Sequence, residues 1–202
     1  MLFNTIRIVL WLIISVGAAL IIKKSKVVRK KLVFGLSVAF CTVMISVFGM
    51  FPVENLFVTF QSPESVFHYT NNGEIDEIIY GKESCLVVYA EANNTVGHYI
   101  IPKSAKGYKI PNYFMVKKVS HKFDENGLFD VYQVRGTQDY YIFGTVHLNE
   151  NDNQIDIYNE LDEKVESNIV RIDNASFIYF YLHDFSDEYY MIVNGEKVFF
   201  LD

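Results

Sequence analysis

The sequence predicts a membrane-anchored protein with a transmembrane hairpin of two helices followed by a mainly antiparallel β domain. Three observations lead to this prediction. Residues 1–53 contain two long apolar runs, the first acidic residue of the chain is Glu54, and the residues beyond Gly73 form short runs rich in Val, Ile, Tyr and Phe. We therefore expect a helical anchor and one β domain, a sandwich or a meander-type sheet, with one short helix at its start.

The longer apolar run, from Leu32 to Val53, contains 22 residues without a charge. At about 1.5 Å of rise per residue, a helix of this length covers roughly 33 Å, which matches the hydrocarbon thickness of a bilayer. Pro52 disfavours a helical conformation for the residue before it, and Glu54 follows directly. The sequence thus predicts a membrane span over about residues 32–52.

The first apolar run extends from Ile8 to Ile22 and lengthens to Leu2 if Arg7 reaches the headgroups. A secretory signal peptide carries its positive charges ahead of the apolar region. Here one basic residue precedes the run and six follow it in residues 23–31. This order favours a second membrane span over about residues 2–22.

The charges divide the chain into two parts. Residues 1–53 hold seven basic residues and no acidic ones, which leaves 11 basic and 24 acidic residues, a net charge of −13, for residues 54–202. The positive-inside rule then predicts a cytoplasmic loop at residues 23–31 and an extracytoplasmic domain at residues 54–202. The strongly acidic domain argues against a nucleic-acid partner.

A short helix is expected at the start of the exterior domain. Ser62 is a typical N-cap, Pro63 suits the first helical position, and Glu64 interacts favourably with the positive end of the helix dipole. Asn71-Asn72-Gly73 is typical of a helix end. The pattern predicts about two turns.

The remaining residues alternate between apolar and polar positions, as half-buried strands do. Asn194-Gly195 is the clearest hairpin signal, because both residues tolerate the positive φ of a type I′ turn. The predicted strands are 75–80, 84–91, 96–102, 113–122, 128–135, 139–149, 154–160, 167–172, 176–183, 188–194 and 197–201.

Two strand pairings follow from the alternation. A hairpin folded about Asp152 places Val146 opposite Ile157 and His147 opposite Asp156, with one apolar and one polar face. Residues 177–201 are expected to form a three-stranded meander that joins the C-terminal strand to the sheet.

The two cysteines lie far apart, Cys41 in the second apolar run and Cys85 in a predicted strand. With a turn at residues 93–94, Cys85 pairs with Pro102 and shares a face with His98, roughly 13 Å away at ~3.4 Å per residue. A Cys–His pair needs a hydrogen bond of about 2.6–3.2 Å. We therefore expect Cys85 to be a small buried hydrophobe.

The other histidines show no spacing typical of a metal site; they are His68, His121, His147 and His183. His147 beside Asp156, or His183 before Asp184, would supply half of an acid–base or metal site, but a solvated position is the simpler interpretation. The acidic clusters, densest at residues 149–153, do not match the calcium-loop pattern. The sequence assigns no catalytic, cofactor-binding or metal-binding residue.

In layout and in its composition rich in Asn, Ile, Lys and Tyr, the chain resembles small membrane-anchored proteins of Gram-positive bacteria, a resemblance that rests on no motif. We expect a non-enzymatic accessory, sensing or partner-binding module, held in the bilayer and facing a membrane or envelope protein. Two alternatives remain open: an envelope hydrolase or metal-dependent enzyme using His121, His147, His183 and nearby Asp residues, and an immunity protein that protects its own cell.

Overall fold

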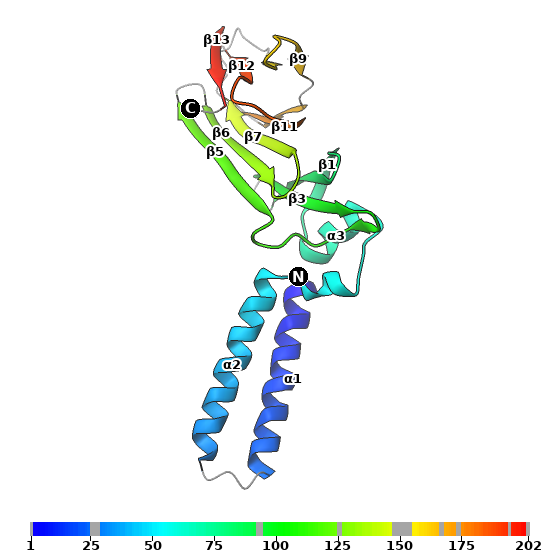
Figure 1. The fold of residues 1–202 in the computed structure, drawn as a ribbon, viewed down its shortest axis with the longest axis vertical. Helices are drawn as coiled ribbons and strands as arrows, with labels where there is room; N and C mark the ends of the chain where they lie inside the picture. Colours follow the sequence, from blue (N-terminus) through cyan, green and yellow to red (C-terminus); the bar gives the residue numbers. More distant parts are fainter. Residues whose placement is uncertain are drawn as a thin grey trace.

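A computed structural model describes residues 2–24, 29–91, 95–124, 127–146, 155–165, 168–172, 175–193 and 195–200 (Figure 1). Two long helices, α1 (Leu2–Lys24) and α2 (Lys30–Met50), lie side by side as an antiparallel hairpin, and the β domain stands at the end where the N-terminus lies. In the described part of the chain, one helix, Lys30–Phe48 with 19 residues, is long and apolar enough to cross a membrane.

The link between the hairpin and the sheets contains a short 3-10 helix, η1 (Val53–Leu56), and the helix α3 (Pro63–Thr70). Ser62 caps α3 as predicted, because its side chain accepts a hydrogen bond from the backbone N–H of Ser65. Val66 and Phe67 are fully buried against the first sheet. The predicted start, end and length of this helix are therefore confirmed.

The strands of the described residues form three antiparallel sheets, which confirms the mainly antiparallel β domain. The first sheet has the order β1 (Glu74–Tyr80), β2 (Ser84–Ala90), β3 (Val96–Ser104), β4 (Gly107–Tyr108). The second has the order β10 (Asn168–Ile172), β11 (Ala175–His183), β7 (Asp139–Val146), β6 (Gly127–Val134), β5 (Val116–Asp124). The third has the order β13 (Glu196–Phe199), β12 (Tyr190–Val193), β8 (Asp156–Tyr158), β9 (Lys164–Val165).

The apolar side chains arrange α3 and the three sheets as successive layers. On one face of β2, Cys85 and Val87 pack against α3, and on the other face Leu86 packs in the same cluster as Tyr141 of the second sheet. Neighbouring residues of the second sheet, such as Ile142, point the other way into a cluster shared with the third sheet. Sheet two is thus the middle layer, with the first sheet against one face and the third sheet against the other.

Both predicted pairings of the late strands need correction. Val146 lies opposite Gly127 and Ser176, so β7 has β6 and β11 as neighbours and does not pair with β8. Similarly, β11 and β12 belong to different sheets, so residues 177–201 form no continuous meander. An alternating strand fits any antiparallel neighbour with the same pattern, and the alternation therefore did not identify the partner.

The last hairpin is confirmed by its register. Val193 pairs with Glu196, which leaves two residues in the turn, and Gly195 has a φ of 82°. Asn194 lies outside the described residues, as do the predicted turn about Asp152 and His147.

Candidate functional site

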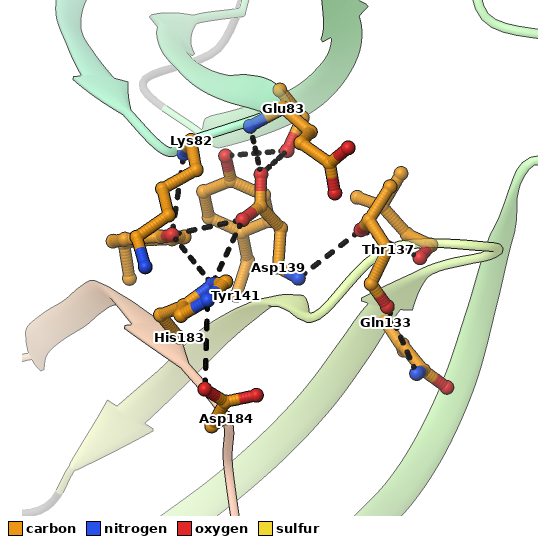
Figure 2. A network of polar contacts seen from close by, with 11 residues as sticks. Lys82, Glu83, Gln133, Thr137, Asp139, Tyr141, His183 and Asp184 are labelled. Carbon is orange, nitrogen blue, oxygen red and sulfur yellow. Dashed lines mark hydrogen bonds and ion pairs between the residues drawn. The ribbon is translucent and has the colours of Figure 1, made fainter.

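A buried carboxylate lies where the first two sheets meet. Asp139, the first residue of β7, is fully buried and accepts hydrogen bonds from the Ser84 hydroxyl (2.6 Å), the Glu83 backbone N–H (2.8 Å) and the Tyr181 hydroxyl (2.8 Å). Nδ1 of His183 lies 3.6 Å from the same carboxylate. Figure 2 shows Glu83, in the turn before β2, and His183, on β11, on either side of the Asp139 carboxylate.

These contacts decide the charge of the site. Burial alone raises the pKa of Asp139, but the hydrogen bonds from Ser84, Glu83, Tyr181 and His183 outweigh it and hold the pKa below its ordinary value of 3.8. Burial and the bond to this carboxylate raise the pKa of Tyr181 to about 12. Asp139 is therefore an anion at neutral pH.

The network around Asp139 joins two sheets. The Tyr141 hydroxyl lies 2.9 Å from the Ser84 hydroxyl, and the backbone N–H of Lys82 donates to the Tyr181 hydroxyl. A Cβ atom at Gly81 would lie 2.8 Å from the Asp139 carboxylate and 2.6 Å from the Tyr141 hydroxyl, so this turn approaches closely only without a side chain. The arrangement fits a structural clamp.

A second carboxylate cluster lies on β5 and β6, where His121 and Asp130 are opposite each other. Asp130 accepts from Nζ of Lys118 (2.8 Å), the Tyr132 hydroxyl (2.9 Å) and Nδ1 of His121 (2.6 Å). Burial alone raises the pKa of Asp130, but the hydrogen bonds from Lys118, His121 and Tyr132 outweigh this effect and hold the pKa below its ordinary value. Because Nδ1 of His121 is engaged, Nε2 is the ring nitrogen left for another ligand, and half of this side chain is exposed.

A groove of about 300 Å³ runs beside this cluster. The ring of His98 stacks on Phe143, with 4.6 Å between centroids, and lies 5.1 Å from that of Tyr132. Burial lowers the pKa of His98, so its imidazole is neutral at pH 7. The lining residues are His98, Tyr99, Ile100, Pro111, Asn112, Tyr113, Val116 and Tyr132. Such a mixture of aromatic rings with an amide and an imidazole suits a ligand with apolar and hydrogen-bonding parts.

The register of β2 and β3 differs by one residue from the prediction. Cys85 pairs with Ile101, whereas His98 pairs with Val88, so Cys85 and His98 point to opposite faces of the sheet. Cys85 is fully buried, and burial raises its thiol pKa to about 12. The thiol is the small buried hydrophobe that the sequence predicted, and the predicted common face is wrong.

The remaining predicted histidines lie in separate places. His121 contacts Asp130, and His183 lies between Asp139 and Asp184, whose carboxylate is 3.5 Å from its Nε2. Asp130 is opposite Phe143, four residues along β7 from Asp139, so the two clusters are more than about 13 Å apart. His68 is exposed on α3. Among the described residues, no group of three or more His, Cys, Asp or Glu side chains lies close enough to hold a metal ion.

Sequence reasoning did not find the carboxylates at the centre of either cluster. Both lie within strands rich in Val, Ile, Tyr and Phe, where a charged side chain is unusual. An Asp at an inward position of such a strand, two residues from a Tyr on the same face, is the signal that would have identified Asp130 and Asp139.

Comparison with known proteins adds no family to this description. The chain matches no protein-family model, and no curated protein or solved structure is significantly similar to it. The function must therefore be inferred from the chemistry and placement of the groove, the two clusters and the hairpin.

Proposed function

We propose that this chain is a two-span membrane protein that presents its β domain outside the cytoplasm as a binding module for a membrane or envelope protein. The supporting observation is the arrangement of charge along the hairpin. Nη2 of Arg7 lies 3.0 Å from a carboxylate oxygen of Glu54 at one end, and Nζ of Lys30 donates to the Lys23 carbonyl at the other. Two charged levels thus bound the apolar parts of both helices.

The surface between these levels suits lipid. Apolar side chains are widely exposed on both helices, among them Ile13 (64%), Ile21 (71%), Leu36 (63%) and Phe40 (66%). In water such a surface would be costly, whereas acyl chains cover it without penalty. The 15 residues between Arg7 and Lys23 cover only about 22 Å, and the long basic side chains at both ends extend this length by reaching the headgroups.

Cysteine accessibility in intact cells tests the topology. In a Cys41→Ala background, we expect Asp187→Cys and Thr5→Cys to react with an impermeant maleimide from outside, and Ser25→Cys to react only after permeabilisation. Protection of Thr5→Cys alone would mean that only α2 crosses the membrane. Protection of Asp187→Cys in intact cells would overturn the exterior placement.

The groove is the candidate binding surface of the exterior domain. It lies at the junction of β3 with β5 and β6, and its aromatic lining provides large contact areas with polar handles. A photo-crosslinking amino acid at Val116, in the groove, should capture a protein in growing cells. The same amino acid at Leu161, exposed on another part of the domain, is the control. Equal capture at both positions, or none at Val116, would contradict a binding role for the groove.

One observation favours an enzyme as a second candidate. The contact of 2.6 Å between Asp130 and Nδ1 of His121 is the geometry by which a carboxylate orients a general base. If this function is correct, cells that carry His121→Gln should show the same phenotype as cells in which the gene is deleted, while the protein level is unchanged. Under the binding function, these cells should behave as wild type.

A further inference from the structure

Two loop tips beside the hairpin expose large apolar side chains. Leu56 is the last residue of η1 and Phe57 follows it; they are 78% and 87% exposed. Tyr113 and Phe114 precede β5 and are 77% and 45% exposed. Monomeric proteins rarely leave such neighbouring aromatic and aliphatic side chains in water without a partner. We refer to these four residues as the apolar rim.

The apolar rim is continuous with the end of α2. The backbone N–H of Tyr113 donates to the Met50 carbonyl (3.2 Å), and the rings of Phe51 and Phe114 lie 5.6 Å apart. The rim therefore begins at the level where the apolar surface of the hairpin ends.

Both tips are held in place by polar contacts behind them. The side-chain amide of Asn55 donates to the Ile110 carbonyl (2.7 Å) and accepts from the Ile110 N–H (2.9 Å). Nζ of Lys109 donates to the Asn55 carbonyl, the Val58 carbonyl and the Thr59 hydroxyl, at 2.7 to 3.0 Å. Because the backbones are tied together, presenting the apolar side chains to a partner costs little conformational entropy.

We infer that the apolar rim inserts into the interfacial layer of the outer leaflet, so that the β domain rests on the bilayer; this rests on the proposed two-span topology. Aromatic side chains concentrate at this depth, and amphipathic elements bury their apolar faces about 5–10 Å into it. The Lys109 ammonium and the acidic domain stay on the water side. Since Tyr113 also lines the groove, the groove opens at the membrane surface, where it meets the juxtamembrane part of a partner.

Tryptophan fluorescence in vesicles tests the insertion. The full chain is reconstituted into phosphatidylcholine vesicles with acyl chains brominated either near the headgroup or deep in the core. Phe57→Trp and Phe123→Trp are compared in a Trp11→Phe background. Phe123 is a matched control, because it is 76% exposed but lies near the end of β5, which runs away from the hairpin (Figure 1).

The inference predicts blue-shifted emission from Phe57→Trp with stronger quenching by the shallow bromines, and red-shifted, unquenched emission from Phe123→Trp. Unquenched, red-shifted emission from Phe57→Trp overturns it. Blue-shifted emission without quenching also overturns it, because protein then covers the rim. The native Trp11, about 6 Å along α1 from Arg7, reports on the span separately. If neither set of bromines quenches it in the wild-type protein, the proposed topology is wrong, whatever Phe57→Trp shows.

Discussion

Asp139 remains charged inside the protein because donors from two sheets are fixed around it. Tyr181 comes from β11, Ser84 is the first residue of β2, and the Glu83 N–H belongs to the turn before β2. Moving any of these elements would leave a buried anion without its partners, which is costly. The residue therefore couples the packing of two sheets.

Replacing this carboxylate should destabilise the domain. Asp139→Asn places an amide group opposite donors, and we expect the free energy of unfolding to fall by about 3 kcal/mol. Denaturant unfolding of the full chain in mild detergent measures the change. Asp187→Asn, on an exposed residue, is the control and should stay within about 0.5 kcal/mol of wild type. A similar small effect of Asp139→Asn would contradict the clamp.

The same network makes the stability of the domain depend on pH in the acidic range. The pKa of Asp139 is lower in the folded state than in the unfolded state. The stabilisation by the Asp139 carboxylate is therefore complete above the unfolded-state pKa and is lost as the pH falls through the folded-state pKa. Stability should therefore decline below about pH 4 in wild type, and less steeply in Asp139→Asn. Parallel acid curves for the two proteins would contradict this assignment.

Protonation of His98 should cause a second and smaller dependence of stability on pH, at higher pH than that of Asp139. Burial lowers its pKa, so the unfolded chain binds the proton more readily and stability falls as the pH drops below the ordinary value of 6.5. His98→Phe keeps a ring against Tyr132 and Phe143 but cannot titrate. We expect the unfolding free energy of this variant to change less than that of wild type between pH 7 and pH 5. An unchanged slope would show that another group causes it.

At the scale of elements, the local sequence pattern predicted the positions of most strands but not the strands with which they pair. The alternation and turn residues predicted a strand over 139–149 and the structure has β7 at Asp139–Val146, because both signals lie within the strand itself. The neighbour of β7 depends on residues far along the chain. β6 and β11 present the same alternation as β8, and only the packing of three layers distinguishes them.

The register error at Cys85 has an equally local cause. The N–H of Glu91 donates to the Thr95 carbonyl, so the connection from β2 to β3 has three residues between these two, where the prediction used a two-residue turn at residues 93–94. One extra residue moves a side chain to the other face. The sequence could not predict the Asp139 clamp for a related reason, since its donors come from strands that are brought together only by the sheet packing.

The Asn55 side chain makes two of the hydrogen bonds that link the two tips of the apolar rim, both to the backbone of Ile110. Asn55→Ala leaves both backbone groups of the buried Ile110 without this partner, and we expect a loss of about 1–3 kcal/mol in unfolding free energy. Asn55→Asp still accepts a hydrogen bond but cannot donate one. It should give an intermediate loss in the same denaturant measurement, and equal effects of both variants would contradict a two-bond role.

At the scale of the whole molecule, the β domain is joined to the hairpin at several points. Arg7 pairs with Glu54, the Tyr113 N–H donates to the Met50 carbonyl, and α1 contacts α3. A single covalent link would let the domain swing, whereas these separate contacts restrict it. The groove and the apolar rim therefore keep a fixed position relative to the membrane under the proposed topology.

The Arg7–Glu54 pair is the contact whose removal should free the domain most clearly. Both side chains are largely buried, and the Arg7 guanidinium also donates to the Phe48 carbonyl. In Arg7→Leu, we expect a stability loss of about 2 kcal/mol and a broader distance distribution between spin labels at Lys24 and Glu188. The exchange of both residues, Arg7→Glu with Glu54→Arg, should narrow the distribution again, but only in part, because the bond to Phe48 is not restored. Arg135→Leu, on an exposed arginine of the domain, is the control. An unchanged distribution in Arg7→Leu would mean that the remaining contacts alone hold the domain in place.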